Sequence, residues 1–340
     1  MKKKVLVTGG TGYIGSHTVV ELIQKGYEVI IADNLSNSFE WIVDRIESIT
    51  NVKPIFHIVE LTNLKDVETL FSQYPDISGV IHFAALKAVG ESVLKPLYYY
   101  QNNIVSLLNL LDTMEKHSVS NIVFSSSCTV YGQPTNLPVT EESPILPANS
   151  PYGYTKQVSE KIIQDQTYCT KLKAIFLRYF NPIGAHDTAL IGELPLGIPN
   201  NLIPFITQTA IKKREILNVF GNDYHTTDGT CIRDYIHVVD LAKAHISALE
   251  RLNETDPSQK VEIFNIGTGN GFSVLEVIKS FEKVSGVDLN YRFAPRREGD
   301  IEKIWADTNR ATHVLGWKAE KTLDDMLYSA WKWEQKIQDL

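Results

Sequence analysis

The sequence predicts an α/β fold in which a doubly wound parallel sheet is followed by a smaller mixed α/β region. In the first half of the 340-residue chain, short apolar runs alternate with amphipathic segments. This alternation is typical of parallel strands joined by helices on both faces of a sheet. After about Asn181 the chain is rich in Gly, Pro and Asn, and the regular alternation ends. We therefore expect a Rossmann-type domain at 1–180 and a second domain at 181–340, whose late strands could return to the main sheet.

Individual elements follow from the apolar pattern, and Pro151 marks the start of one helix. The strands expected in the first half are Lys4–Thr8, Glu28–Asp33, Pro54–Val59, Gly79–Phe83, Asn121–Ser126 and Lys173–Tyr179. The helices expected there are Thr11–Lys25, Leu64–Gln73, Pro96–Lys116 and Tyr152–Tyr168. In the second half we expect a loop at Asn181–Asn201, helices at Leu202–Lys213, Val238–Leu252, Val274–Val284 and Thr322–Gln338, and strands at Val261–Ile266 and Leu289–Phe293.

Composition and charge narrow the class of partner. An apolar content of 43% is enough for a large core. The net charge of -7 argues against nucleic acid or an anionic membrane as the main partner. No stretch approaches the roughly 20 apolar residues of a membrane span. An anionic ligand would therefore need positive charge that is placed locally.

The cysteines and the start of the chain indicate a cytoplasmic protein. Cys128, Cys169 and Cys231 are odd in number and widely spaced, which suits a reducing compartment rather than a disulfide framework. Met1 and the three lysines at 2–4 are followed by only three apolar residues before Thr8, too few for a signal peptide.

The nine histidines show no metal-site spacing, so we expect no catalytic metal. His82 and His237 lie in apolar runs and are expected to be hydrogen-bonded core residues.

Three glycines form the first candidate site. Gly9, Gly12 and Gly15 follow the first strand at three-residue spacing and open the first helix. Such a turn lets the backbone approach a pyrophosphate, which then binds at the helix N-terminus. Asp33 ends the second strand, 18 residues after Gly15, where a carboxylate would bond the adenosine ribose and repel a 2′-phosphate. The pattern favours NAD over NADP; a ligand-free tight turn and a solvated loop acid are the alternatives.

Tyr152 and Lys156 form the second candidate site, because residues four apart share one face of a helix. A phenol has a pKa of about 10, and lowering it to about 7 requires roughly 4 kcal/mol. A nearby ammonium and a cationic nicotinamide could supply that energy. The alternative is an ordinary surface Tyr–Lys pair.

With these two sites, the chain resembles the extended short-chain dehydrogenase/reductases, and more closely the UDP-glucose 4-epimerase (UDP-galactose 4-epimerase) family. The segments that carry the resemblance run over nearly the whole chain. They are Thr8–Gly15, His82–Ser92, Ser125–Gly132, Ser150–Gly153, Arg178–Pro182, Gly197–Leu202, Phe220–Asp223, Arg233–His237 and Ala294–Asp300.

The resemblance implies a role for each of three catalytic residues. Tyr152 is the base for the sugar 4-hydroxyl, Lys156 holds the nicotinamide ribose, and Ser127 bonds the 4-oxygen. A turn-forming serine is the alternative for Ser127. Transient oxidation at C4 with NAD, rotation of a 4-keto hexose and return of the hydride would interconvert UDP-glucose and UDP-galactose.

The resemblance also implies two sets of binding residues. The NAD contacts are Gly9, Gly12, Tyr13, Ile14, Gly15, Asp33, Asn34, Leu35, Ser36, Asn37, Ser38, Glu60, Leu61, Phe83, Ala84, Ala85, Leu86, Lys87, Asn102, Ser127, Tyr152, Lys156 and Phe180. The UDP-hexose contacts are Lys87, Ser127, Tyr152, Asn181, Asn201, Leu202, Asn218, Val219, Phe220, Arg233, Tyr235, Arg297, Asp300 and Ile304. Glu60-Leu61 replaces the family's usual Asp-Ile beside the adenine. Arg233 and Arg297 would bind the diphosphate; surface ion pairs are their alternative.

Specificity and assembly are expected from the same resemblance. The family's aromatic residue that restricts N-acetylated sugars is replaced by Ile304, so weak activity on UDP-GlcNAc and UDP-GalNAc is expected. The helices predicted at Pro96–Lys116 and Tyr152–Tyr168 would form a homodimer interface.

Three other functions are the alternatives. A nucleotide-sugar 4,6-dehydratase would need an Asp-Glu pair where this chain has Cys128 and Thr129. A one-way reductase or decarboxylase and a silent NAD-sensing protein are the other two.

Overall fold

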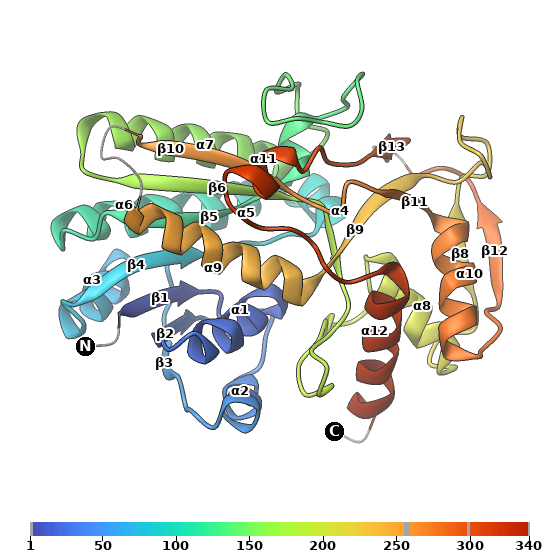
Figure 1. Ribbon diagram of the computed structural model, residues 1–340, viewed down its shortest axis with the longest axis horizontal. Helices are drawn as coiled ribbons and strands as arrows, with labels where there is room; N and C mark the ends of the chain where they lie inside the picture. The colour runs from blue at the N-terminus through green and yellow to red at the C-terminus, as the bar shows by residue number, and fades with distance from the viewer. Residues whose placement is uncertain (1–2, 255–258, 298–299, 339–340) are drawn as a thin grey trace.

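The computed structural model describes residues 3–254, 259–297 and 300–338. Residues 1–2 of the basic start and residues 298–299 of the Ala294–Asp300 segment lie outside this part of the chain. The described residues build a seven-stranded, fully parallel sheet with helices on both faces (Figure 1). The predicted α/β, doubly wound fold is confirmed.

The order of the strands reverses at the first strand, as in other Rossmann folds. Across the sheet the strands are β10 (Val261–Ile266), β6 (Lys173–Tyr179), β5 (Asn121–Ser127), β4 (Ile77–His82), β1 (Lys4–Thr8), β2 (Glu28–Asp33) and β3 (Ile55–Ile58). Figure 1 shows β10, from late in the chain, lying beside β6, which it pairs with in parallel. A late strand therefore returns to the main sheet.

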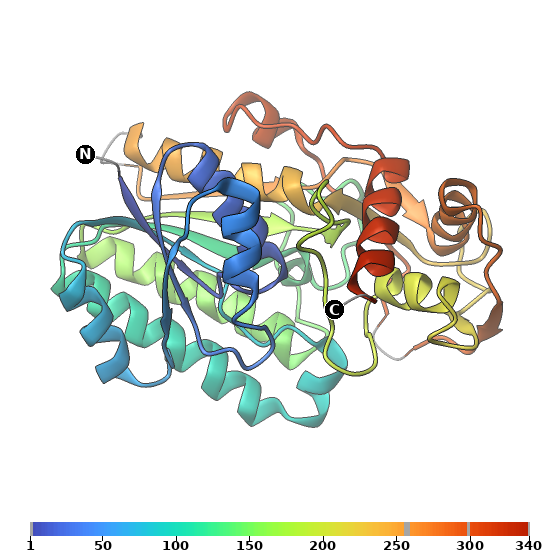
Figure 2. The ribbon, with the colours of Figure 1, turned by 90° about the horizontal axis from the view of Figure 1, so that it is seen from below.

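Alternate residues of each strand pack on opposite faces, because side chains alternate along a strand. Val5 and Val7 of β1 pack on one face and Leu6 on the other. The first face is covered by α1 (Tyr13–Gln24), α2 (Ile42–Thr50), α9 (Val238–Glu254) and α11 (Asn309–His313), and the second by α3 (Leu64–Gln73), α6 (Ser106–Lys116) and α7 (Pro151–Cys169). In the view from below, α6 and α7 run side by side (Figure 2).

The helix predicted at Pro96–Lys116 is not one regular helix. It comprises α5 (Pro96–Tyr100), a π-helical turn η1 (Gln101–Val105) and α6, and it follows a separate short helix α4 (Val89–Leu94). A π turn is frequent at functional sites because it changes the direction of side chains within a helix. Here it carries Asn102, which was predicted to bind the cofactor. Apolar periodicity alone does not reveal such a turn.

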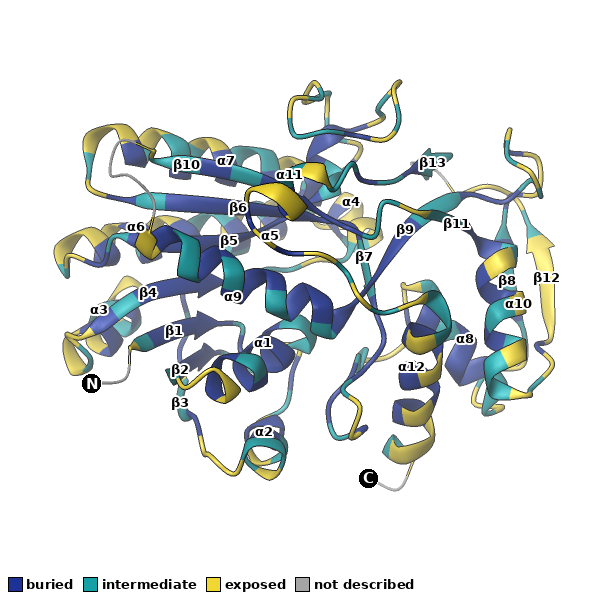
Figure 3. Cartoon of the chain, viewed as in Figure 1, coloured by how far each residue is buried: buried dark blue, intermediate teal, exposed yellow. Residues whose placement is uncertain are grey.

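The second region has two small sheets. The first contains β7 (Asn181–Ile183), β9 (Ile232–His237), β11 (Gly271–Ser273) and β13 (Lys303–Ile304), and the second contains β8 (Leu217–Phe220) and β12 (Tyr291–Ala294). Their helices are α8 (Leu202–Ala210), α10 (Val274–Ser285) and α12 (Leu323–Ile337), with a 3-10 turn η2 (Cys128–Tyr131) on the main-sheet side. The central strands are buried, whereas β12 is largely exposed (Figure 3).

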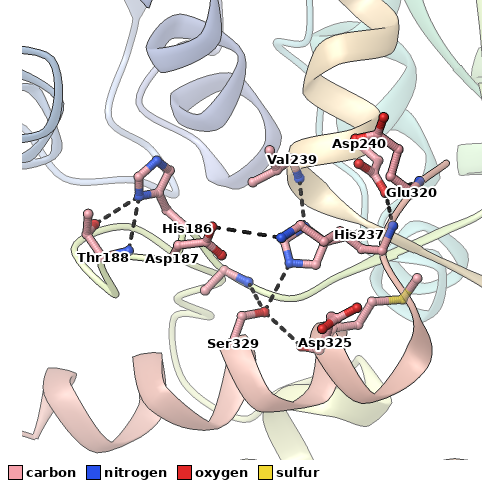
Figure 4. A network of polar contacts seen from close by, with 12 residues as sticks. His186, Asp187, Thr188, His237, Val239, Asp240, Glu320, Asp325 and Ser329 are labelled. Atoms are coloured by element: carbon pink, nitrogen blue, oxygen red, sulfur yellow. Dashed lines mark hydrogen bonds and ion pairs between the residues drawn. The ribbon is translucent and has the colours of Figure 1, made fainter. Parts of the chain in front are cut away.

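A buried serine joins the C-terminal helix α12 to the rest of the fold. Ser329 Oγ accepts a hydrogen bond from the backbone N–H of Ala185 over 3.1 Å and lies 3.1 Å from His237 Nε2. The backbone N–H of Val239 donates to Nδ1 of His237, so Nε2 carries the proton that is donated to Ser329 (Figure 4). His237 is therefore a hydrogen-bonded core residue, as predicted. So is His82, which lies 2.8 Å from Thr8 Oγ1 through its Nδ1.

Candidate active site

The carboxyl ends of the central strands surround a cavity of about 590 Å³. Gly9 follows β1, Asp33 ends β2, Phe83 follows β4 and Ser127 ends β5, and all four residues line this cavity. Ligands of open α/β sheets bind at this edge, where the strand order reverses. The volume is in the range of small-molecule sites.

Two of the predicted cradle glycines pack against backbone atoms with no space for a side chain. Gly9 has a φ of +72°, and a Cβ on it would lie 2.8 Å from the backbone nitrogen of Ala84. A Cβ on Gly15 would lie 2.1 Å from the carbonyl oxygen of Gly9. The turn is therefore packed so tightly that these two positions accept only glycine, as expected for the predicted cradle.

Asp33 has a second task that sequence reasoning did not foresee. Its carboxylate accepts hydrogen bonds from the backbone N–H of Thr11 over 3.2 Å and of Leu35 over 2.9 Å, and from Ser38 Oγ over 3.1 Å. These bonds tie the glycine turn to the loop after β2. A carboxylate has about four lone-pair positions, so acceptor capacity remains for a ribose.

Tyr152 and Lys156 lie on one face of α7, as the spacing predicted. The Lys156 Nζ lies 5.9 Å from the ring centre of Tyr152 and 4.9 Å from that of Phe124. Nζ also donates to the backbone oxygen of Ser125 over 2.6 Å. Both side chains line the cavity together with Ser127, so the structure brings the three predicted catalytic residues into one place.

In the protein without a cofactor, the pKa of Tyr152 is raised rather than lowered. Burial raises the pKa of this phenol well above its ordinary value, Tyr179 adds to the rise, and a hydrogen bond with Ser127 opposes it. Burial disfavours the charged phenolate, and Lys156 does not outweigh this. A base of this kind needs further positive charge within the site.

Burial lowers the pKa of Lys156, the cation of the pair, whereas it raises the pKa of Tyr152. It lowers the pKa of Lys156 to about 8, while the negative charge of Glu160 acts to raise it. The ammonium is thus held in a poorly solvated place, where it interacts strongly with nearby oxygens.

Almost the whole predicted cofactor set lines the cavity. Leu35 is the exception, and its backbone N–H bonds Asp33 instead. Glu60 and Leu61 are among the lining residues, so the longer carboxylate still reaches the cavity wall. The cavity is also lined by four of the predicted substrate residues, Lys87, Ser127, Tyr152 and Asn201.

The other predicted substrate residues do not line this cavity. They are Asn181, Leu202, Asn218, Val219, Phe220, Arg233, Tyr235, Arg297, Asp300 and Ile304. Strand pairing nevertheless joins several of them. Asn181 of β7 is the register partner of Tyr235 of β9, and Arg233 of β9 is the partner of Ile304 of β13.

Arg297 is partly held by its neighbours. Its guanidinium lies 4.8 Å from the ring centre of Phe220, and its Nε is 3.3 Å from Asp300. Its side chain keeps 52% exposure, so it remains accessible to an anion. The neighbouring Arg296 pairs with Asp223 at 2.7 Å.

Several cavity residues escaped sequence reasoning. Tyr99 and Glu91 line the wall and bond one another over 2.9 Å. The Gly- and Pro-rich loop also lines it, with Glu193 and the residues Leu194, Pro195, Leu196, Ile198, Pro199 and Asn200. The available signal was the position of this loop, between Asn181 and Asn201, which were both assigned to the substrate.

Metal and membrane features were searched in residues 3–254, 259–297 and 300–338. No group of three or more His, Cys, Asp or Glu side chains there is arranged to hold a metal ion. No helix in this part of the chain is both long and apolar enough to span a membrane.

Known proteins resemble this chain over nearly its full length. The family model for GDP-mannose 4,6 dehydratase matches residues 6–330. UDP-glucose 4-epimerase from Dictyostelium discoideum is 52% identical over 97% of this chain and 95% of its own. The crystal structure of UDP-glucose 4-epimerase from Bifidobacterium longum in complex with NAD+ and UDP superposes with a TM-score of 0.94, at 47% identity and 99% coverage of both chains.

A further solved structure bears on specificity. It is the UDP-Glc/GlcNAc 4-epimerase from Campylobacter jejuni, with a TM-score of 0.84, 37% identity, and coverage of 98% of this chain and 99% of that one. About half of all positions are thus shared with an epimerase over nearly the whole length, together with the fold. The chain belongs to the UDP-glucose 4-epimerase family.

Proposed function

We propose that this protein interconverts UDP-glucose and UDP-galactose by NAD-dependent oxidation and re-reduction at C4 of the sugar. The observation that carries the proposal is the meeting of Tyr152, Lys156 and Ser127 in one cavity with the glycine cradle. Membership of the epimerase family and the NAD named with the Bifidobacterium longum relative support it.

The site fits the dinucleotide. Gly9 and Gly15 allow the tight turn before α1 at which a pyrophosphate would bind, and Asp33 stands at the end of β2 for the adenosine ribose. The chemistry that a bound nicotinamide supplies here is reversible hydride transfer at C4. Its positive charge in the oxidised form also stabilises a phenolate, which the burial of Tyr152 makes necessary.

In this proposal, side chains of the protein transfer the proton of the 4-hydroxyl and bind the oxygens of the sugar and the cofactor. Tyr152 takes the proton from the 4-hydroxyl and later returns it. Ser127 bonds the 4-oxygen, and Lys156, fixed on Ser125, bonds the nicotinamide ribose. Arg233 and Arg297 bind the diphosphate, which retains the oxidised sugar while its hexose turns over.

Mixing the purified protein with UDP-galactose, without added NAD, tests the proposal. We expect UDP-glucose to form with no net consumption of cofactor, and isotope at C4 to be kept. Net production of NADH, or loss of the isotope to solvent, would contradict the proposal.

A dehydratase is the second candidate, because the matching family model carries that name. Elimination of water needs a carboxylic acid beside the active-site hydroxyl, but Cys128 and Thr129 follow Ser127. Burial raises the pKa of Cys128 to about 12, so this thiol is a poor acid–base group near neutrality. The site chemistry favours the epimerase.

Domain roles and assembly complete the proposal. Residues 1–180 would bind NAD and 181–340 the nucleotide sugar, with β10 and α9 as parts of the second segment that pack with the first. A cytoplasmic homodimer would bury the apolar side chains that α5, α6 and α7 expose, among them Leu97, Leu108 and Tyr168 with 79%, 47% and 76% exposure. The three helices are neighbours, with α5 packed on α7 and Gln166 of α7 bonded to Glu115 of α6. Sedimentation equilibrium can test this interface.

A further inference from the structure

An acidic side chain that no role above uses stands between two predicted substrate residues. The carboxylate of Glu193 accepts a hydrogen bond from Asn201 Nδ2 over 2.6 Å and lies 3.5 Å from Lys87 Nζ. All three side chains line the cavity. Lys87 comes from the loop after β4, and Asn201 stands before α8, so Glu193 connects the two sides of the site.

The backbone of Glu193 is held by α12. Trp333 Nε1 donates to the carbonyl oxygen of Glu193 over 2.9 Å. The same indole packs so closely on Gly192 that a Cβ there would lie 2.5 Å from the ring. A backbone bridge between Ala185 and Gly192 closes the other side of the loop. With its main chain held in this way, Glu193 directs its carboxylate into the cavity wall rather than to solvent.

The start of this loop is hydrogen-bonded to residues near both termini of the chain. Tyr13, in the cradle, donates from its hydroxyl to the carbonyl oxygen of Gly184 over 2.6 Å. Ser329 of α12 accepts from Ala185, and Figure 4 shows this serine between His237 and the loop. The loop therefore gives Glu193 a fixed position between the cofactor side and the second region.

Glu193 is much less exposed to solvent than the lysine that it contacts. The Glu193 side chain is 11% exposed, whereas that of Lys87 is 54% exposed. Asn201 precedes α8 but makes no side-chain cap bond with it, so its amide is oriented by Glu193 instead. Long and exposed donors lose conformational freedom when they bind a ligand, and prior orientation reduces that cost.

We propose that Glu193 is a positioning residue of the substrate site, whose carboxylate orients Asn201 and Lys87 toward the bound nucleotide sugar. This inference rests on the proposed function, because it takes a UDP-hexose as the ligand. The short bond to Asn201 is the larger contribution. The contact with Lys87 is longer and more exposed, and an ion pair of this kind contributes little in water.

Two substitutions separate these contributions. Glu193→Ala removes both contacts, and we expect the Kd for UDP-galactose to rise about tenfold, the size of one charge-assisted hydrogen bond. Glu193→Gln keeps an acceptor oxygen for Asn201 and loses only the charge, so a rise of about twofold is expected. In both variants kcat should stay within about twofold, because neither lost contact involves Tyr152, Lys156 or Ser127.

Calorimetric titration with UDP-galactose measures Kd without relying on turnover, and the initial rate of epimerisation gives kcat. The matched control is Asp187→Asn, which removes the same charge from the same loop at a side chain that is 75% exposed and does not line the cavity. It should leave both values unchanged. Bound NAD and the melting temperature are measured for all variants.

An unchanged or lower Kd in Glu193→Ala would overturn the inference. So would an equal loss of bound NAD and melting temperature in Glu193→Ala and Glu193→Gln, since that pattern means a general structural role. If the unmodified protein binds UDP-galactose but does not epimerise it, the proposed reaction fails while the Kd series still decides the role of Glu193. If it binds no UDP-galactose, both the reaction and the inference fail.

Discussion

Lys156 donates a hydrogen bond from Nζ to the backbone oxygen of Ser125 over 2.6 Å, two residues before Ser127 on the same strand. The bond fixes the ammonium at the end of β5, beside the ring of Tyr152. A flexible lysine is thereby converted into a fixed charge. The relationship explains why helix α7 and strand β5 must pack closely for the site to exist.

Replacing Tyr152 by Phe removes the proton acceptor and keeps the ring. We expect kcat to fall by about 10²–10⁴, the usual range for loss of a general acid–base group, while NAD stays bound. Bound NAD is measured after denaturation, and turnover by conversion of UDP-galactose. Near-normal turnover would exclude Tyr152 as the base.

Replacing Lys156 by Met is expected to stabilise the cofactor-free protein and inactivate it. The folded pKa of about 8 lies below the ordinary 10.5, so between these pH values the unfolded chain holds more protons. Stability from this group therefore rises with pH across that window, and below about pH 8 the burial of the charge costs roughly 3 kcal/mol.

Loss of the bond to Ser125 offsets about 2 kcal/mol of this gain, which leaves a net increase of about 1 kcal/mol in the free energy of unfolding at pH 7. Urea denaturation of NAD-free protein measures it. A less stable variant would show that the buried ammonium is not a cost to folding. Glu160, which acts against the lowering of the pKa, remains in both proteins.

Replacing Glu160 by Ala should destabilise the fold by about 3–5 kcal/mol, because it leaves the buried charge of Arg178 unpaired. Arg178 Nη2 and Nε donate to this carboxylate over 2.6 and 2.9 Å, and Ser126 Oγ donates over 2.5 Å. Thermal or urea denaturation gives the change.

The control for Glu160 is on the same helix. Lys161 and Asp165 form an i,i+4 pair with side chains that are 66% and 55% exposed, so Asp165→Ala should cost less than about 0.5 kcal/mol. Similar losses in the two variants would refute the distinction between the buried and the exposed pair.

His237 should make the fold sensitive to acid. Burial lowers its pKa to about 4, and a second proton would displace the bond from the backbone N–H of Val239. Since the unfolded pKa is about 6.5, its contribution to stability is complete above that pH and is lost as the pH falls toward 4, by up to about 3 kcal/mol.

Urea denaturation from pH 7.5 to pH 4.5 measures this dependence. His237→Gln should show a shallower decline than the unmodified protein. Part of the decline should remain, because burial also lowers the pKa of His17 to about 3 and of His245 to about 4. Parallel pH curves for the two proteins would exclude a contribution from His237.

Ile304→Tyr tests selectivity between plain and N-acetylated hexoses. Ile304 is buried and packs in one apolar cluster with Phe180, which lines the cavity. A larger ring at this position reduces space beside Phe180, so kcat/KM should fall more for UDP-GlcNAc than for UDP-glucose. The unmodified protein should prefer the plain sugars and retain weak N-acetyl activity.

Melting temperatures are needed for this comparison, because enlarging a buried side chain typically costs about 1–3 kcal/mol. Equal efficiency of the unmodified protein on both sugar pairs, with no selective effect of Ile304→Tyr, would contradict the role of this residue.

Much of the fold was accessible from local pattern. The strands Lys4–Thr8, Glu28–Asp33, Lys173–Tyr179 and Val261–Ile266 were predicted with the bounds observed. Buried parallel strands are continuous apolar runs, and these runs are visible without any tertiary information. The helix Leu202–Lys213, by contrast, ends at Ala210, because the pattern does not mark where a helix frays.

The candidate site divides in the same way. Spacing and family resemblance identified the glycine turn, Asp33, Tyr152 and Lys156, since these are short motifs with a local geometry. The role of Glu193 was not visible, because its partners lie on separate loops. The burial that raises the pKa of Tyr152 was not visible either, since it depends on all the segments that cover the ring.

The amino-acid sequence by itself determined the main-sheet strands and most of their helices, the cradle turn and the face of α7 that carries the phenol and the ammonium. The helix α2 and the strands β7, β8 and β9 were not predicted. Tertiary structure alone decided that β10 lies beside β6, that Ser127 meets this face, and that Glu193 stands between Lys87 and Asn201. The physical reason is the distance along the chain over which each effect acts. Backbone geometry and apolar periodicity act over a few residues, whereas desolvation and convergence of side chains arise only when distant segments pack together.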